Sequence, residues 1–234
     1  MTLVSSSRLA GFALAGLLGA ALSTAAGAAQ GPSLQGSRPL ITQANPQAQG
    51  GIQTPQDTRV TNLIGNGSFE KPVLANGGYA TFAVGANLGS WTVVGPTGSS
   101  VLLINDQFTE FGYGFPAAQG KQSLDLTGAG ANLPGGVQQS VATNPGTNYT
   151  LSFESGNIAS GPDGTTSTVL VLVNGVQLDM ATNFSGQGLM YEVWEPFTAT
   201  FTATTSTTSI AFYNQDGPGD GLNGLDNIKM SVQR

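Results

Sequence analysis

The sequence predicts an all-β fold, a two-sheet antiparallel β-sandwich, over residues 59–234. Charged residues are only 9% of the chain, and 34 of its 234 residues are glycine. Few charges combined with many glycines and short turns are typical of all-β domains. Short apolar or alternating runs recur between turn signals, and no window has helical periodicity. A segment of this length buries enough surface to form a core of its own.

The residue types that are missing exclude several functions. The chain has no cysteine and no histidine, and its formal net charge is -6. Disulfides, a Ser-His-Asp triad and a histidine zinc site are therefore excluded. An acidic chain without a basic patch is not expected to bind nucleic acid. The remaining chemistry belongs to carboxylates, whose oxygens suit calcium or magnesium.

Residues 1–28 have the pattern of a secretory signal peptide. Arg8 precedes an apolar run at residues 9–22, and residues 26–28 read Ala-Gly-Ala, which matches the cleavage pattern. An uncleaved anchor is the alternative, although the run is short for a membrane span. Residues 29–58 are rich in glutamine, glycine and proline and predict a flexible linker. The mature protein is expected to be secreted, extracellular or periplasmic, and free of the membrane.

Short strands and turn signals alternate through the first half of the folded segment. Asn66-Gly67 predicts a turn, and residues 74–90 and 105–120 are expected to be long loops. The predicted strands lie at residues 60–64, 91–94, 101–104, 122–126 and 135–141.

The second half has the clearer strand signals. Asn174-Gly175 is the strongest hairpin signal in the chain. Residues 194–204 alternate, with Phe197 and Phe201 on one face and threonines on the other, which predicts a half-buried antiparallel strand. The other predicted strands lie at residues 149–153, 168–173, 176–180, 210–213 and 225–230.

Several segments occur in an order that resembles the DUF642 family, over about residues 60–232. The resemblance implies a galactose-binding-like sandwich, similar to jelly-roll carbohydrate-binding modules, that binds polysaccharide at a cell wall or surface without catalysis. The chain lacks the cysteines of the plant members and has one copy of the domain. The matching segments are NLIGNGSFE at 62–70, GSWTV at 89–93, FPAAQGKQSLDL at 115–126, GVQQ at 136–139, PGTNYTLSF at 145–153 and LDNI at 225–228.

The resemblance also implies a structural calcium ion (Ca2+). Related modules join a glutamate near the start of the domain to an aspartate on the final strand, and the matching residues are Glu70 and Asp226. A cation held there would tie the two ends of the domain together, with backbone carbonyls completing its ligands. The alternative is that Glu70 caps a turn and Asp226 is solvated. The loop at 216–224 does not fit the EF-hand spacing and is read as a glycine turn, with a second cation as the alternative.

Aromatic side chains are the candidate glycan-binding residues, because the apolar face of a pyranose stacks on an exposed ring. Trp91 precedes a regular strand and is assigned to the core. The alternative for the other rings is that they only cover the edge of the sandwich. The ring candidates are Phe111, Tyr113, Trp194 and Tyr213, together with Tyr79 and Tyr191, and the candidate partners for sugar hydroxyls are Asn214 and Asp216, together with Gln215.

A catalytic role is not expected. Glu192 and Glu195 flank Trp194, but residues three apart on a strand point to opposite faces, whereas a glycosidase needs two carboxyls across one bond. The sequence therefore predicts a secreted, non-catalytic module that binds a polysaccharide or other glycan. The alternative is a structural or adhesive matrix protein that binds other proteins through an exposed sheet.

Overall fold

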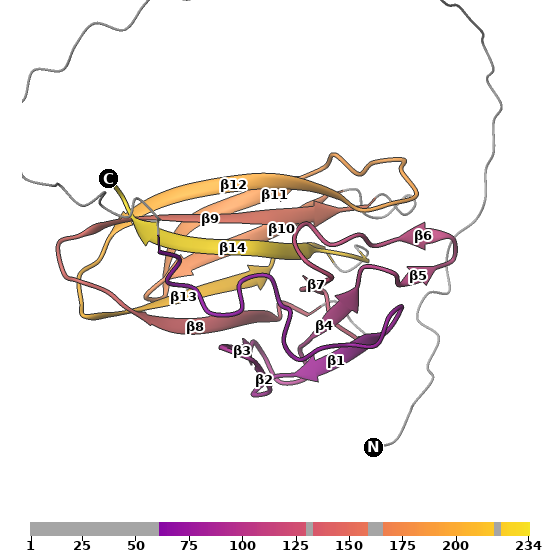
Figure 1. Cartoon of the computed structure of the whole chain (residues 1–234), viewed down its shortest axis with the longest axis horizontal. Coiled ribbons are helices and arrows are strands. Elements are labelled where there is room, and N and C mark those ends of the chain that lie inside the picture. Colours follow the sequence, from indigo (N-terminus) through magenta and orange to yellow (C-terminus); the bar gives the residue numbers. More distant parts are fainter. Residues whose placement is uncertain (1–60, 130–132, 159–165, 218–220) are drawn as a thin grey trace, which may run out of the picture. The chain divides into compact units, whose positions relative to one another are not determined.

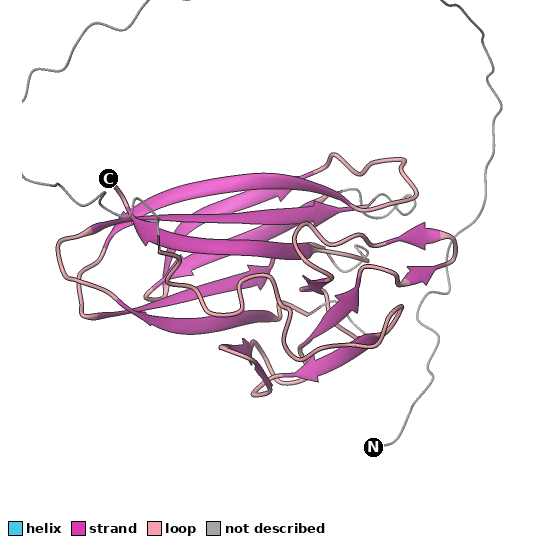
Figure 2. Cartoon of the chain, viewed as in Figure 1, coloured by secondary structure: helices cyan, strands magenta, loops and turns pink. Residues whose placement is uncertain are grey.

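The computed structural model describes residues 61–129, 133–158, 166–217 and 221–234 (Figure 1). The predicted signal peptide and linker lie outside these residues. Within the described ranges, all the regular secondary structure is β-strand (Figure 2). None of the described residues forms a helix long and apolar enough to span a membrane.

Two six-stranded antiparallel sheets make up the domain, together with one small hairpin. In spatial order the first sheet contains β1 (Tyr79–Ala83), β4 (Ser100–Asn105), β7 (Gln122–Asp125), β14 (Gly224–Val232), β9 (Asn148–Asn157) and β12 (Val193–Thr202). The second contains β11 (Val176–Asn183), β10 (Ser167–Val173), β13 (Thr207–Asn214), β8 (Gly136–Ala142), β3 (Trp91–Val94) and β2 (Asn87–Leu88). The hairpin pairs β5 (Thr109–Glu110) with β6 (Tyr113–Gly114). The predicted sandwich is confirmed.

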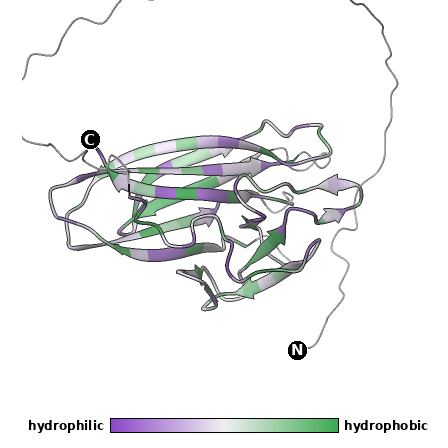
Figure 3. Cartoon of the chain, viewed as in Figure 1, coloured by the Kyte–Doolittle hydropathy of each residue, from purple (hydrophilic) through white to green (hydrophobic). Residues whose placement is uncertain are grey.

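The main core lies between the two six-stranded sheets. Leu103 and Leu225 from the first sheet and Val137 and Phe212 from the second belong to one buried cluster. Trp91 is fully buried in it, as predicted, with ring centroids 5.8 Å from Phe69 and 6.0 Å from Phe212. Hydrophilic and hydrophobic residues alternate along most of β14 (Figure 3), because successive side chains of a strand point to opposite faces; a register shift interrupts the pattern between Asp226 and Lys229.

The strongest sequence signals are confirmed in detail. Asn174 and Gly175 have φ values of 49° and 78° and join β10 to β11, as a type I′ hairpin turn requires. Along β12, the Phe197 ring stacks 5.6 Å from Phe153 and the Phe201 ring 5.7 Å from Tyr149. The intervening threonines of β12 are exposed.

The predicted strand at residues 60–64 is wrong over its described part, residues 61–64. This segment instead runs beside β14: Leu63 N donates to Met230 O at 2.8 Å, and Ile228 N donates to Gly67 O at 2.9 Å. Conversely, β1 and β2 lie within residues 74–90, and β5 and β6 within residues 105–120, where loops were expected. The partner strands determine these four strands, since their sequences have little hydrophobic alternation.

Candidate functional site

One row of cross-strand neighbours defines the outer face of the first sheet. Trp194 pairs with Gly156, Gly156 with Gly224, and Gly224 with Asp125. These side chains point away from the main core, because Leu102, the neighbour of Asp125 in β4, belongs to a second apolar cluster. The outer face is therefore partly covered, not simply solvated. The second cluster contains Leu102, Ile104, Phe115, Ile158 and Leu222, with Phe108 and Tyr113 packed against it.

Backbone hydrogen bonds fix the β5–β6 hairpin to the chain that enters β12. Gly114 N donates to Met190 O at 2.9 Å, and Glu192 N donates to Gly114 O at 3.0 Å, so that Gly114 and Tyr191 form a parallel bridge. Two residues beyond Gly114, the carbonyl of Pro116 accepts a hydrogen bond from Trp194 Nε1 at 2.7 Å. Two segments distant in sequence thus form one structural unit.

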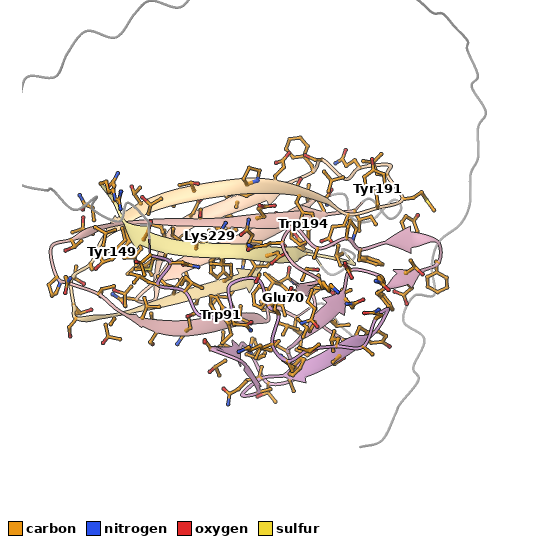
Figure 4. All side chains as sticks on the ribbon, viewed as in Figure 1. Glu70, Trp91, Tyr149, Tyr191, Trp194 and Lys229 are labelled. Carbon is orange, nitrogen blue, oxygen red and sulfur yellow. The ribbon has the colours of Figure 1, made fainter. Side chains whose placement is uncertain are left out.

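An aromatic surface lies on this unit; we define it as Phe111, Tyr113, Tyr191 and Trp194. Phe111 is 65% exposed and Tyr191 54% exposed, while Tyr113 and Trp194 are partly exposed. Phe111 occupies the hairpin turn at a φ of 50°, a left-handed conformation that bulky residues rarely adopt. Figure 4 shows Tyr191 and Trp194 at the end of the first sheet where the hairpin of Figure 1 lies. The structure therefore places four of the predicted ring candidates, Tyr191 among them, on one structural unit.

Three carboxyl groups are buried beneath or beside this surface. Glu192, Asp125 and Asp226 are 3%, 4% and 0% exposed. Burial, followed by the charges of Asp125 and Asp226, raises the pKa of Glu192 well above its usual value. Burial also raises the pKa of Asp226 to about 7; hydrogen bonds from backbone N–H groups oppose that shift, and the charge of Glu154 adds to it.

The acids predicted to hold calcium both contact the segment 118–122. Glu70 Oε1 accepts from Lys121 N at 2.8 Å and from Gln122 N at 3.0 Å, and Asp226 Oδ2 accepts from Gln119 N at 2.8 Å. The side-chain atoms that Glu70 and Asp226 could offer to a metal ion are carboxylate oxygens, which calcium prefers as ligands. Within the described residues, however, no group of three or more acidic side chains is arranged to hold a metal ion. An ion here would need carbonyls or water as further ligands, and calcium stays a prediction.

Tyr213, Asn214 and Asp216 do not belong to the aromatic surface. Tyr213 and Asn214 end β13 in the second sheet, and Asn214 is 1% exposed. Asn214 Oδ1 accepts from Asn223 Nδ2 at 2.8 Å and from Asp216 N at 3.0 Å, while Asp216 Oδ1 accepts from Thr168 N at 2.6 Å. Asn214 is therefore buried away from the aromatic surface, Asp216 is only partly buried, and their role as partners of sugar hydroxyls stays a prediction.

The two glutamates that flank Trp194, Glu192 and Glu195, lie in different environments. The Glu192 side chain is buried on the outer face of the first sheet. The Glu195 carboxylate accepts a hydrogen bond from the Ser185 hydroxyl. Sequence reasoning missed the structural part that Glu192 plays beside Trp194. The spacing of two residues between them was the available signal, since it places both side chains on one face of an extended chain.

Comparison with protein-family models identifies the family. The family whose model matches residues 62–229 is described as Protein of unknown function (DUF642). A search of curated proteins gives no match.

Solved structures with a similar fold include modules that bind glycans. A structure of TmCBM61 in complex with beta-1,4-galactotriose has a TM-score of 0.45 and 15% identity, covering 74% of this chain and 99% of that one. The CBM22-1 xylan-binding domain of Paenibacillus barcinonensis Xyn10C has a TM-score of 0.41 and 17% identity, covering 68% and 97%. The enzymatically active domain of Bacteriophage CBA120 tailspike protein 4 has a TM-score of 0.43 and 15% identity; the match covers 74% of this chain but only 21% of the tailspike chain.

Proposed function

We propose that this chain, which belongs to the family described as Protein of unknown function (DUF642), binds an extracellular polysaccharide and catalyses no reaction. The observation that carries the proposal is the aromatic surface: rings that are exposed, yet sit on segments fixed by backbone hydrogen bonds. The sequence pattern of residues 1–28, which lie outside the described residues, supports export.

Exposed rings on a fixed backbone suit a sugar ligand. The apolar face of a pyranose stacks on an aromatic ring, and its hydroxyls need polar partners nearby. Phe111 and Tyr191 are held at the hairpin and at its bridge to the chain before β12. Because these segments are already ordered, binding would cost little additional conformational entropy. Rings that serve only the core, such as Trp91 and Tyr149, are fully buried instead.

Two observations support binding without catalysis. Glycoside hydrolysis needs two carboxyls that flank one glycosidic bond. Glu192 is 3% exposed, and the side chain of Glu195 is engaged by Ser185. The environments of these two acids therefore support the proposal of binding without catalysis.

Affinity electrophoresis tests the proposal directly. The chain is run through gels that contain β-1,4-galactan, xylan, pectin or a β-glucan, and retardation by at least one polymer is expected. Tyr191→Ala and Phe111→Ala should each weaken that retardation by roughly 2- to 10-fold, since an aromatic contact contributes about 0.5–1.5 kcal/mol. Val176→Ala is the matched control, because Val176 is 70% exposed but belongs to β11 of the second sheet. All three variants should keep the melting temperature of the parent chain.

The same gels separate a glycan binder from an adhesive matrix protein. Retardation by a polysaccharide should disappear when the matching free sugar is added. A chain that no polymer retards, or whose retardation survives both substitutions, is not a glycan-binding module of the proposed kind. Release of soluble sugar from any polymer would instead indicate an enzyme.

A further inference from the structure

Two glycines form a slot in the outer face of the first sheet. Gly156 and Gly224 are cross-strand partners on β9 and β14, and neither has a positive φ. A Cβ atom at either position would overlap Glu192 Oε1 and would lie 2.9–3.0 Å from the Trp194 ring. Glycine is therefore required here for space and not for backbone conformation. The slot is filled by the carboxyl of Glu192 and the indole of Trp194.

One oxygen of the carboxyl in this slot has no partner of the kind that a buried charge needs. Glu192 Oε1 is buried and accepts no hydrogen bond. The charged groups that act on it are both acids, Asp125 on β7 and Asp226 on β14. An ionised carboxylate in such a place is strongly destabilised, whereas a neutral carboxyl is tolerated. The geometry of the slot thus favours a protonated Glu192.

Glu192 is also the residue through which the aromatic surface is attached to the sheet. Its own N–H bonds to Gly114 of the hairpin, Tyr191 precedes it, and Trp194 lies beside it over the same two glycines. The carboxyl and the Trp194 ring thus share one slot, and the backbone of the same residue is bonded to the hairpin.

We propose that Glu192 is a proton-operated latch: its neutral carboxyl, seated on Gly156 and Gly224, holds Tyr191 and Trp194 against the hairpin, and loss of the proton releases them. The aromatic surface is then ordered in acid and loosened as the pH rises. That the latch controls glycan binding rests on the proposed function, but the latch itself does not.

Among the described residues of the strands around the slot, the one cationic side chain is Lys229 of β14, whose partner on β9 is Ser152, four residues from Gly156. On β9 the acid on the same face is Glu154, which lies opposite Asp226 and acts on it. On the hairpin the titratable side chains are Glu110 and Tyr113. Glu195 of β12 points to the opposite face of the sheet. Raising the pH therefore adds only negative charge near Glu192.

Iodide quenching of tryptophan fluorescence tests the latch in the whole chain. Trp91 is fully buried, so a change in quenching reports Trp194, the other tryptophan of the chain. From about pH 4 to about pH 9, the ratio of quenchable to protected Trp194 should rise by up to tenfold per pH unit through the transition. Glu192→Gln should remain protected at every pH. Glu195→Gln, the matched control with the same loss of charge, should follow the parent chain.

Three results would overturn the latch: a parent chain whose quenching does not change with pH, a transition that survives in Glu192→Gln, or a transition that calcium suppresses relative to EDTA. The third would mean that a cation, not a proton, neutralises the acids.

In gels made with a polymer that binds, retardation of the parent should decline at high pH while that of Glu192→Gln should not. If no polymer binds at any pH, the proposed function fails and the quenching experiment still decides the latch.

Discussion

The two tryptophans of this chain occupy opposite environments. Trp91 lies between Phe69 and Phe212, and its Nε1 donates to Asn66 O at 3.0 Å, so both the ring and its polar atom are satisfied in the core. Trp194 lies on the outer face, partly exposed, with its Nε1 bound to the carbonyl of Pro116. One tryptophan stabilises the sandwich, and the other anchors the hairpin that bears the proposed binding surface.

Substitution of each tryptophan should separate these two roles. Trp91→Ala should lower the free energy of unfolding by about 3–5 kcal/mol, because it leaves a large cavity among packed rings. Trp194→Phe should cost less than about 1.5 kcal/mol, since a partly exposed ring of similar shape remains. Urea denaturation at fixed pH measures both. A smaller loss for Trp91→Ala than for Trp194→Phe would contradict the placement of Trp91 in the main core.

At the scale of elements, β9 and β14 are joined at a point where neither has a side chain. Gly156 and Gly224 face each other across the ladder, and the Glu192 carboxyl covers both. Each glycine in isolation resembles any of the others in a glycine-rich sequence. Their pairing depends on the register between strands almost seventy residues apart in the chain, which hydrophobic alternation alone does not specify.

A double-mutant cycle measures the coupling between the slot and its occupant. Gly156→Ala should destabilise the fold by about 1–3 kcal/mol, because its Cβ would overlap the Glu192 carboxyl. In a Glu192→Ala background the same change should cost less, since that carboxyl is gone, and the difference is the interaction energy. Gly114→Ala is the control: a Cβ there meets open space at an ordinary φ, so little change is expected. Additive effects of Gly156→Ala and Glu192→Ala would show that the slot does not hold Glu192.

At the scale of the whole molecule, the first and last segments of the described domain are joined. Asn62 Oδ1 accepts from Met230 N at 2.9 Å, and residues 63–67 bond along β14 (Figure 1). Glu70 and Asp226 then bind neighbouring amides of one segment, residues 119–122. Because Asp226 takes part in these contacts and its pKa is raised in the folded state, we expect its protonation to affect global stability.

The stability of the calcium-free chain should therefore fall as the pH rises from about 4 to about 7. The pKa of Asp226 is raised from 3.8 to about 7 in the folded state, so the folded chain binds more protons than the unfolded chain in that window. This contribution is fully present below pH 3.8 and is lost as the pH rises to about 7, with a slope of at most about 1.4 kcal/mol per pH unit. Urea denaturation in EDTA across this range measures it.

Added calcium should reduce this decline, because a cation between Glu70 and Asp226 would stabilise the ionised aspartate. Calorimetric titration should then show heat of binding for the parent chain and little for Glu70→Gln, with a matching difference in melting temperature. The absence of both signals would remove the predicted calcium ion, while a stability that increases with pH in EDTA would contradict the raised pKa of Asp226.

Local sequence patterns were enough to predict the sandwich, the strands with strong alternation, the Asn174-Gly175 hairpin and the burial of Trp91, since periodicity and turn chemistry are local properties. The aromatic candidates Phe111, Tyr113, Tyr191 and Trp194 were also evident from the sequence. Three features became visible only in the folded chain: the hairpin joins the chain at Tyr191, Asn214 is internal, and Glu192 occupies a slot between two glycines. These features depend on contacts between distant strands, whose register is set by the packing of the whole sandwich.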